Sequence, residues 1–457
     1  MSKTKTIYSC TNCGSVYPKW QGQCHACGEW SSIVEEMATP KVKGSLMSIS
    51  NKLTESPPLR LNSINLTEQL RLNMLDPELN RVLGGGLVPG TFVLLGGEPG
   101  IGKSTLILQT ALRLESRVLY VSGEESSLQL KLRADRLGSE QGECLIYTET
   151  NLEKIISTAL ATRPDLLVID SIQTIQTELS ESGPGSVSQI RECANKLLQY
   201  CKTEQVPIIL IGHINKEGSI AGPKILEHTV DVVLQFEGDE HYMYRILRGR
   251  KNRFGSTSEL GIYEMQQGGL RPVENPSEHL IQKDRLQLSG LAIAAAMEGA
   301  RPFLIETQAL VSSAVYATPQ RSATGYDTKR MNMLLAVLEK RVGFKLIQKD
   351  VFLNIAGGIK ISDPASDLAI ITAIFSSSID IAVPEGICLT GEVGLSGEVR
   401  SVSRIEQRII EAERIGFNTI ILPRSSHAGL SHRSSMGIRI VEVSTVREAF
   451  KLLFGGS

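Results

Sequence analysis

The chain has 457 residues, 41% of them hydrophobic and 21% charged, and its formal net charge is -1. This length exceeds what one hydrophobic core usually supports, so we expect two or three domains. The near-neutral charge excludes a polyanion partner held by the overall field, because such a partner would need local basic patches. No apolar run approaches the ~18 residues of a membrane span, and the N-terminus has no hydrophobic signal segment. We therefore expect a cytoplasmic protein with no membrane partner.

Two Cys-x2-Cys-Gly motifs, ten residues apart, lie near the N-terminus and contain Cys10, Cys13, Cys24 and Cys27. Two such pairs fit a tetrahedral zinc site, because one tight turn supplies each pair of thiolates. Gly14 and Gly28 can take the positive φ that these turns require. A redox dithiol is the alternative, but it needs only one pair. We expect a zinc-binding module over 1–30, followed by a linker over 31–60.

An apolar strand over 92–95 leads into a glycine-rich loop and then into a helical pattern. The loop and first helical positions are Gly97, Glu98, Pro99, Gly100, Ile101, Gly102, Lys103, Ser104 and Thr105. This is the P-loop motif between a strand and a helix, and it predicts a nucleoside triphosphate site. Backbone N–H groups would surround the phosphates at the helix N-terminus. Lys103 would reach the β- and γ-phosphates, and Ser104 would bind Mg2+.

Three later apolar runs are expected to be strands that end in polar side chains. The run VLYVSGEES ends in Glu124 and Glu125, either of which can polarise the attacking water, and Glu124 is preferred. The run PDLLVID ends in Asp170, which is placed to orient Mg2+ and its water. The run VPIILIGH ends in His213, which is either a γ-phosphate sensor or a structural histidine. Strands that alternate with helices predict an α/β domain with a parallel sheet covered on both faces.

Two glycine-rich loops, over 182–189 and 216–224, follow strands of this expected sheet, where binding residues tend to lie. A basic stretch comes next, with five cations in nine positions: Arg245, Arg248, Arg250, Lys251 and Arg253. In a nearly neutral chain, the candidate partners of this density are a neighbouring acidic face, a nucleotide phosphate and a nucleic-acid backbone. An ordinary solvated face would show the same pattern.

The pattern changes near residue 280, where short helices and strands begin to mix, so we expect a separate α+β domain over 280–457. Apolar residues at helical spacing over 331–342 predict an amphipathic helix that ends at Gly343. Asp363 and Pro364 are expected as the N-cap and first residue of another helix.

The order of these motifs closely resembles the bacterial RadA (Sms) family of RecA-like ATPases over essentially the whole chain. The resemblance rests on the paired zinc motifs, GGEPGIGKST, YVSGEES, LLVIDSIQT, GHINKEGSIAGPKILEH and the family-specific KNRFG. It implies a RecA-like ATPase domain over 61–275. ATP and Mg2+ would be the ligands of this domain, and Zn2+ would be bound by the N-terminal module. It also implies single-stranded and branched DNA as partners, a hexameric ring, and branch migration beside the RecA recombinase.

The same resemblance implies roles for four basic residues. In RecA-like rings the neighbouring subunit supplies cations to each ATP, so Lys251 and Arg253 would act there or would contact DNA. An arginine finger of this kind is worth ~10³-fold or more in rate. Lys216 and Lys224, on the second glycine-rich loop, would contact the DNA backbone in a salt-dependent way.

The C-terminal domain resembles the proteolytic domain of the Lon protease, including TGEVGLSGEV and the helix after it. Lon uses a serine in a Pro-Ser-Ala-Gly setting, activated by a lysine. Here Ala365 stands at the serine position, Ser366 is displaced by ~100° around a helix, and Glu406 aligns with the lysine. We expect a proteolytically inactive domain that supports ring assembly and binds DNA. The available cations there are Lys345, Lys349 and Arg400.

Two other functions compete with a DNA-stimulated motor. An ATP-regulated protease or unfoldase is disfavoured by the missing serine and lysine. An ATP-switched assembly scaffold would use nucleotide to set its oligomeric state, and DNA would not accelerate its ATP turnover.

Overall fold

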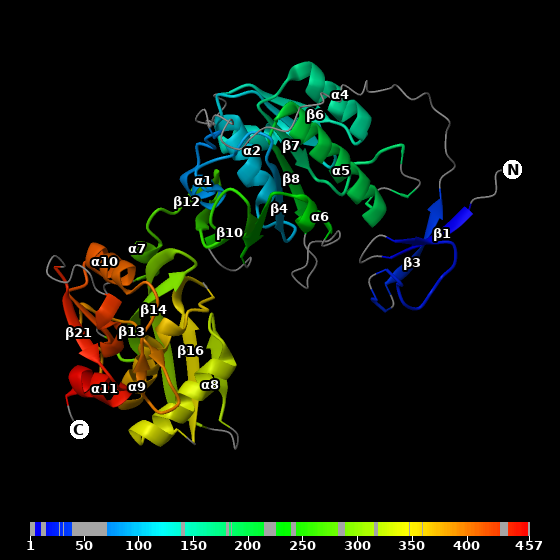
Figure 1. Ribbon diagram of the computed structural model, residues 1–457. Helices are drawn as coiled ribbons and strands as arrows, with labels where there is room; N and C mark the ends of the chain where they lie inside the picture. The colour runs from blue at the N-terminus through cyan, green and yellow to red at the C-terminus, as the bar shows by residue number, and fades with distance from the viewer. Residues whose placement is uncertain are drawn as a thin grey trace. The chain divides into compact units, whose positions relative to one another are not determined.

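The computed structural model divides into two compact units that are described separately below (Figure 1). The residues described are 5–10, 15–26, 28–30, 32–38, 71–138, 142–179, 182–183, 185–213, 225–238, 244–281, 288–314, 319–346, 348–358, 360–429 and 437–455. Unit 1 comprises Met1–Asp239, Arg245–Thr257 and Tyr263–Pro272, and unit 2 comprises Glu240–Tyr244, Ser258–Ile262 and Val273–Ser457. Among the described residues, no helix is long and apolar enough to cross a membrane.

The N-terminal part of unit 1 is a small antiparallel sheet of β1 (Lys5–Cys10), β2 (Val16–Tyr17) and β3 (Ile33–Ala38). The central strand β1 pairs with both others, with Tyr8 opposite Tyr17 and Cys10 opposite Ile33. This pairing sets Cys10 at the end of β1, opposite the first residue of β3.

The rest of unit 1 is built on a nine-stranded sheet in the order β12-β11-β10-β9-β4-β8-β7-β5-β6. The parallel part consists of β4 (Phe92–Gly97), β5 (Val118–Ser122), β6 (Cys144–Thr148), β7 (Leu166–Asp170), β8 (Ile208–His213) and β9 (Val232–Glu237). Three further strands, β10 (Tyr244–Asn252), β11 (Leu260–Gln266) and β12 (Gly269–Pro272), extend it through antiparallel pairs. The expected parallel sheet is therefore confirmed as the core of a larger mixed sheet.

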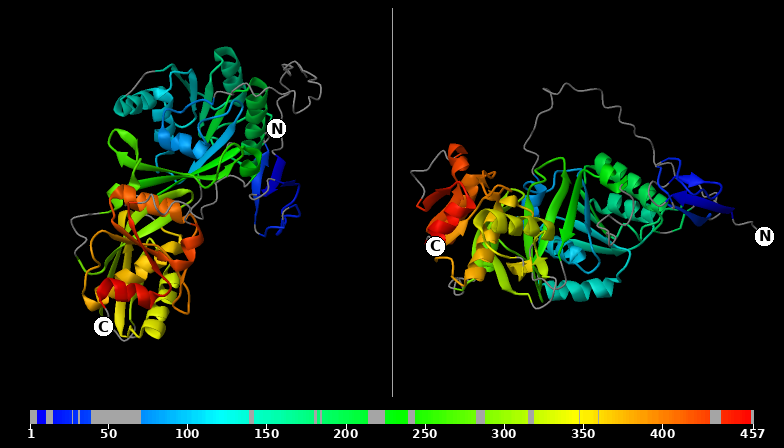
Figure 2. Two further views of the ribbon diagram at one scale, coloured as in Figure 1. Left: turned by 60° about the vertical axis from the view of Figure 1, so that its left-hand side comes forward. Right: turned by 90° about the horizontal axis from the view of Figure 1, so that it is seen from below.

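Helices cover both faces of this sheet. Consecutive residues of its buried strands point to opposite sides, so both faces carry apolar side chains that pack against helices. Val93 and Leu95 of β4 pack in one apolar cluster with residues of α1 (Pro77–Leu83), α2 (Lys103–Arg113) and α3 (Ser127–Leu137). Phe92 and Leu94 pack in the other cluster with α4 (Leu152–Thr162), α5 (Val187–Glu204) and α6 (Ile225–Thr229). Figure 2 shows this layered arrangement from two further directions.

Most helices of unit 1 begin at a side chain that accepts a hydrogen bond from the first turn. Asp76, Ser126, Asn151 and Ser186 serve this role for α1, α3, α4 and α5. Such caps satisfy N–H groups that have no partner inside the helix. Among the helices whose N-cap is described, α2 differs, because its N-cap Gly102 is left-handed and has no side chain to offer.

Unit 2 contains a seven-stranded mixed sheet in the order β15-β16-β14-β13-β17-β20-β21. Its strands are β13 (Leu291–Glu298), β14 (Arg301–Ser313), β15 (Arg321–Thr324), β16 (Lys349–Ile355), β17 (Ile387–Leu389), β20 (Thr419–Pro423) and β21 (Arg439–Val443). A separate hairpin pairs β18 (Glu392–Val393) with β19 (Val399–Arg400).

The helices of unit 2 are α7 (Pro276–Leu280), α8 (Thr328–Val337), α9 (Asp367–Ile379), α10 (Ile405–Ile415) and α11 (Val446–Phe454). A π-helical turn over Leu338–Val342 extends α8 and ends at the left-handed Gly343, as predicted. Asp363 and Pro364 begin a 3-10 turn over Pro364–Ser366 that runs into α9, which confirms the predicted cap. The expected α+β character of this region is confirmed.

Candidate nucleotide-binding and catalytic site

The P-loop lies between the end of β4 and the start of α2, where the sequence motif requires it. Gly102 has φ of 112° at the N-cap of α2, a backbone conformation that residues other than glycine rarely adopt. Gly97 approaches the neighbouring strand closely, since a Cβ there would lie 2.7 Å from the carbonyl oxygen of Phe236. The uncapped first turn of α2 leaves its N–H groups and helix dipole available to an anion. This geometry suits a phosphate group.

Lys103, the first residue of α2, is only 4% exposed. Its Nζ donates hydrogen bonds of 2.8 Å to the carbonyl oxygens of Gly97 and Glu98 within the loop. Burial lowers the pKa of Lys103 to about 8, while the charges of Asp170 and Glu124 act in the opposite direction. The ammonium group is therefore held inside the loop and faces two carboxylates.

The carboxylates come from two neighbouring strands, because Asp170 of β7 is in register with Ser122 of β5. Asp170 is 5% exposed, and its Oδ2 accepts a 2.6 Å hydrogen bond from the hydroxyl of Tyr120. Glu124 lies two residues beyond the end of β5, and its Oε1 accepts a 2.6 Å hydrogen bond from Ser171 Oγ. The fold thus brings together Lys103, Asp170 and Glu124 at one edge of the sheet.

Glu124 and Glu125, which the sequence could not separate by geometry, have different surroundings. Glu125 forms a 2.7 Å ion pair with Arg133 of α3. Burial raises the pKa of Glu125, and the Arg133 charge opposes that rise. Glu125 is therefore engaged by a helix of its own domain, whereas Glu124 is turned toward Ser171 and interacts electrostatically with Lys103. This difference favours Glu124 as the base.

Two residues of this site were not found from the sequence. Tyr120 was interpreted only as part of an apolar strand, although it positions Asp170 through its buried hydroxyl. Arg133 was not singled out in the sequence, although it forms an ion pair with Glu125. A tyrosine at the centre of an otherwise aliphatic buried strand was the available signal, since a buried hydroxyl needs a partner.

Several predicted residues fall partly or wholly outside the described part of the chain. His213 ends β8 in register with Gly97, but its side chain is not among those described. Lys216 and Lys224 lie outside the described residues, as do Cys13, Gly14 and Cys27. Their expected roles in phosphate sensing, DNA contact and zinc binding stay predictions.

Lys251 and Arg253 are not brought next to Lys103 of the same chain. Lys251 pairs in register with Val233, near the start of β9, whereas Gly97 is in register with Phe236 near its end. Other cations of the basic stretch are bound by the adjacent strand. Arg248 contacts Glu237 at 3.4 Å, and Arg250 contacts Glu237 at 2.9 Å and Gln235 at 2.6 Å. Much of the local positive charge is therefore neutralised within the sheet.

The small N-terminal sheet of β1, β2 and β3 and the chain beside it bury both of the cysteines that the structure describes there. Cys10 and Cys24 are 0% exposed and belong to one small cluster with Ile33. Cys10 N donates a hydrogen bond to Ser15 O, and Gly28 N donates one to Cys24 O. Gly28 has the expected positive φ of 76°. The two buried cysteines and the turn that follows Cys24 fit a metal held by cysteine pairs, which Cys13 and Cys27 would complete.

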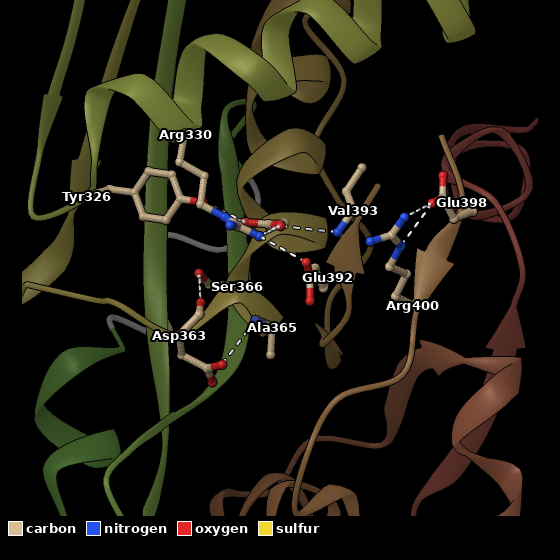
Figure 3. Close-up of polar contacts among 10 residues, drawn as sticks. Tyr326, Arg330, Asp363, Ala365, Ser366, Glu392, Val393, Glu398 and Arg400 are labelled. Carbon is tan, nitrogen blue, oxygen red and sulfur yellow. Dashed lines mark hydrogen bonds and ion pairs between the residues drawn. The ribbon is translucent and has the colours of Figure 1, made fainter. Parts of the chain in front are cut away.

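The Lon-like motif in unit 2 forms a closed polar cluster rather than a nucleophile site (Figure 3). Ala365, at the serine position, is 1% exposed, and its N–H donates to Asp363 Oδ1. Ser366 is 0% exposed, and its hydroxyl donates to the carbonyl oxygen of Asp363 at 2.7 Å. The displaced serine is therefore buried and committed to its own backbone.

The next residue, Asp367, is also fully buried and is bound on both carboxylate oxygens. Oδ1 accepts hydrogen bonds from Tyr326 at 2.6 Å and Arg330 Nε at 2.8 Å. Oδ2 accepts from Arg330 NH2 at 2.6 Å and from Val393 N at 3.1 Å. These bonds raise the pKa of Arg330 above its ordinary value. The carboxylate stands where the Lon motif has glycine and joins α8, α9 and the β18–β19 hairpin.

The aligned lysine position and its neighbours also differ from a catalytic dyad. Glu406 lies in the first turn of α10 and lines a cleft of about 380 Å³ with Arg404 and Ser426. Two residues on, Arg408 is 1% exposed and binds Asp363 Oδ2 at 2.7 Å. Arg400, which was expected as an available cation, is paired with Glu398 at 2.6 Å. Lys349 donates to Ser313 Oγ at 3.2 Å.

Comparison with known proteins assigns all three regions of the chain. Residues 8–35 match a rubredoxin metal binding domain, residues 55–219 match an AAA domain, and residues 338–455 match the C-terminal proteolytic domain of Lon protease (S16). Over 460 residues the chain is 47% identical to the DNA repair protein RadA of Bacillus subtilis, with 100% of both chains covered. It is 45% identical over 458 residues to DNA repair protein RadA of Halalkalibacterium halodurans, again with 100% of both covered.

A solved structure of the RadB recombinase aligns with 44% of this chain and 100% of its own, at 22% identity and a TM-score of 0.36. The zinc ribbon and AAA domain indicate Zn2+ and ATP as the ligands of this chain. The full-length identity to the curated relatives, together with the order of ribbon, ATPase and Lon-like domains, shows that the chain belongs to the family of DNA repair protein RadA.

Proposed function

We propose that this protein is a DNA-stimulated ATPase motor that promotes branch migration during homologous recombination and DNA repair. The observation that carries the proposal is the cluster of Lys103, Asp170 and Glu124 at one edge of the sheet, beside an uncapped helix N-terminus. Its full-length relatives are named DNA repair proteins, which supports DNA as the partner of the ATPase.

The chemistry of ATP hydrolysis can be divided among these residues. The P-loop backbone from Gly97 to Thr105 would hold the phosphates, and Lys103 would exchange its bonds to the loop carbonyls for bonds to phosphate oxygens. Ser104 and Asp170 would hold Mg2+, which supplies charge neutralisation at the phosphates. Tyr120 fixes the orientation of the Asp170 carboxylate for that purpose.

Glu124 is the residue we assign to activation of the attacking water. Its carboxylate follows β5 and is oriented by Ser171, which lies directly after Asp170. A general base must be positioned before its pKa matters, and this hydrogen bond supplies the positioning. Glu125, bound to Arg133, keeps α3 attached to the end of the same strand.

We infer that DNA binding and ring assembly involve the parts of the chain that the ATPase cluster does not use. Lys216 and Lys224 would contact the DNA backbone, and the subunits would form a homo-oligomeric ring, in our proposal a hexamer. RecA and branched DNA are the proposed partners of the working assembly. The Lon-like domain would be a structural and DNA-binding domain and not a protease, which the buried Ala365, Ser366 and Asp367 support.

The test is steady-state ATP hydrolysis with and without single-stranded DNA, at low and at moderate salt. We expect DNA to accelerate turnover, and we expect the acceleration to weaken with salt because phosphate contacts release counterions. A turnover rate that is indifferent to DNA would contradict the motor and favour the assembly scaffold. Hydrolysis of unfolded protein chains would favour the protease instead.

A further inference from the structure

The chain has two tryptophans, Trp20 and Trp30, and both are exposed on the zinc ribbon over 8–35. We propose that the two indoles form a binding site for single-stranded DNA, in which bases stack on their rings over Gly22 and Lys19 contacts a phosphate of the same strand. This inference rests on the proposed function, because it names a part of the chain that holds the DNA partner. It extends that function by giving the ribbon a ligand of its own.

Neither indole belongs to the core of the ribbon. Trp20 is 63% exposed and Trp30 is 70% exposed, whereas the small apolar cluster of this module is made by other residues. Tryptophan has the largest side chain and is buried to a high degree on average in folded proteins. Two exposed indoles in so small a module therefore leave a large apolar area that the fold does not use and that a ligand can cover.

The backbone brings the two indoles to the same position, Gly22. An isolated antiparallel bridge joins Gln23 to Trp30, so the two segments that carry the tryptophans lie side by side. A Cβ on Gly22 would lie 3.7 Å from Cζ3 of Trp30 and 3.9 Å from Cη2 of Trp20. Both rings thus border Gly22, and a glycine there leaves the space beside them without a side chain.

Hydrogen bonds fix the turn that carries the two rings. Cys24 N donates to Glu29 O at 2.9 Å, and Gly28 N donates to Cys24 O at 2.7 Å. Gln23 Nε2 adds a 2.8 Å bond to the carbonyl oxygen of Gly28. Cys24 is one of the expected zinc ligands, so a bound metal would hold the same turn. A backbone that is fixed before the ligand arrives loses little conformational entropy on binding.

The chain neighbours of both tryptophans are polar, which favours a nucleobase over an apolar protein surface. Lys19 and Gln21 flank the first tryptophan. Glu29 and Ser31 flank the second. The core of a protein–protein interface is depleted of charged residues, and its anchors lie in well-packed, desolvated pockets. A nucleobase has flat faces and polar edges, so it can stack on an indole that polar groups surround.

Lys19 supplies the positive charge that a nucleic-acid strand requires. Its side chain is exposed, and no ion pair or hydrogen bond engages it within the described part of the chain. Its place directly before Trp20 sets an ammonium group next to an indole in the sequence, as a nucleotide carries a phosphate next to its base. The pair of ring and cation therefore matches the chemistry of one nucleotide unit.

Stacking on the two indoles selects single strands without selecting a sequence. Every base has a π-face, so the contact tolerates any sequence. In a duplex the faces of the bases are already covered by their neighbours, and only an unstacked strand offers them to an aromatic side chain. The site is therefore expected to prefer oligothymidylate over a duplex of equal length.

The first test uses the intrinsic fluorescence of the full-length protein. Both tryptophans of the chain belong to the proposed site, so their emission reports on this site alone. Titration with oligothymidylate, without ATP or Mg2+, should quench the emission as bases stack on the rings. An abasic oligonucleotide of equal length has the same phosphates and should leave the emission nearly unchanged. Binding of oligothymidylate, measured by anisotropy of a labelled strand, without any quenching would overturn the proposal.

Substitution of the indoles should weaken the affinity for oligothymidylate. Trp20→Leu and Trp30→Leu should each raise Kd by about 5- to 150-fold, since the stacking of one base is worth that factor. Trp20→Phe should recover most of the affinity, because it restores a ring. Val34→Ala is the matched control, since Val34 is an exposed apolar residue of β3 in the same ribbon. All variants should keep the zinc content of the unmodified protein. Unchanged Kd in both leucine variants would overturn the site.

Two further variants test the space beside the rings and the charge separately. Gly22→Leu keeps both indoles but fills the space between them, so it should raise Kd and abolish quenching. Lys19→Ala should reduce the slope of log affinity against log salt by about 0.7, the value for one phosphate contact on a single strand. The leucine variants of the tryptophans should leave this slope unchanged. Full quenching in Gly22→Leu, or an unchanged slope in Lys19→Ala, would contradict the proposed geometry.

These measurements separate the site from the proposed motor. Quenching by oligothymidylate in a protein whose ATP turnover ignores DNA would refute the motor and support the site. DNA-stimulated turnover in a protein that shows no quenching would support the motor and refute the site. If Trp20→Leu and Trp30→Leu lose affinity for the RecA recombinase and keep their affinity for oligothymidylate, the indoles serve a protein partner and the proposal is wrong.

Discussion

One buried carboxylate in each unit, Asp170 in the first and Asp367 in the second, shows how the partners of a side chain decide between a chemical and a structural role. In the ATPase domain, the Asp170 carboxylate accepts a hydrogen bond from one neutral side chain among the described residues, Tyr120, and faces the Lys103 ammonium. In the Lon-like domain, both oxygens of Asp367 are bound by a charged Arg330, a tyrosine and a backbone N–H. The first carboxylate can accept a metal ion, whereas the second has its coordination completed by protein.

A similar difference explains why the P-loop motif predicts a chemical role in this chain and the Lon motif does not. The P-loop pattern keeps its glycines, Lys103 and Ser104, and in the structure Lys103 interacts electrostatically with Asp170 and Glu124 from later strands. The Lon pattern retains the fold but has alanine, a buried serine and a carboxylate in place of its reactive residues. A matching domain therefore predicts a fold in both units, but it predicts chemistry only in the first.

The largest expected effect is that of Lys103→Ala on the ATPase side of this comparison. Removing the ammonium deprives the phosphates of their main cation, so ATP turnover should fall by about 10³-fold or more. Zinc content and the thermal unfolding of the protein should stay close to those of the unmodified chain. Turnover that survives this change would mean that the P-loop cluster is not the hydrolytic site.

Glu124→Gln should have the next largest effect, because it removes the proposed general base while keeping the shape of the side chain. We expect kcat to fall by about 10²- to 10⁴-fold with ATP binding retained. The matched control is Glu125→Gln, which weakens the ion pair to Arg133 and should reduce kcat much less. Equal losses in the two variants, or a larger loss in the control, would reverse the assignment.

Arg330→Ala tests the Lon-like side of the comparison through stability. Removing one partner of a buried ion pair leaves the Asp367 carboxylate uncompensated, which typically costs about 3–5 kcal/mol. Chemical denaturation should therefore show earlier unfolding of unit 2. Arg400→Ala, which breaks the more exposed pair with Glu398, should cause little change. If both variants unfold alike, the Asp367 cluster is not a structural centre.

Tyr120→Phe should have a smaller effect that is confined to the affinity for Mg2+. Loss of the hydroxyl leaves Asp170 in place but less well oriented, and such outer-shell changes typically cost about 10- to 100-fold in metal affinity. We expect a higher Mg2+ concentration for half-maximal turnover and a nearly normal kcat at saturating Mg2+. Tyr147→Phe, on the neighbouring strand β6, is the control. An unchanged Mg2+ requirement would argue against this role of Tyr120.

The smallest expected effect is on pH dependence. With the pKa of Lys103 lowered to about 8 by burial, the nucleotide-free protein should lose this positive charge as pH rises through that value. Bound phosphates favour the charged form, so kcat/KM should fall above about pH 8 while kcat changes less. Between about pH 8 and 10 the unfolded chain holds this proton more tightly than the folded one, so the contribution of Lys103 to folding stability should rise with pH there. A flat kcat/KM up to pH 10 would contradict the shifted pKa.

Local patterns predicted the elements that carry the site, but contacts between distant segments were beyond them. The P-loop, the strand ending at Asp170 and the turn at Gly28 follow from neighbouring residues, and the structure confirms them. The bond between Tyr120 and Asp170 joins residues 50 positions apart, and the Asn252 bond to Val82 spans 170. These pairs depend on strand order and register, which a single sequence does not specify. The same limit left only a slight preference for Glu124 over Glu125, and left open whether Lys251 and Arg253 act on ATP or on DNA.

The most direct test of the central claim is branch migration on a labelled joint molecule made of recombining DNA strands. Our account predicts that the unmodified protein extends the heteroduplex in the presence of ATP and Mg2+, and that Lys103→Ala does not. DNA-stimulated ATP hydrolysis without any movement of the branch point would contradict the proposed motor.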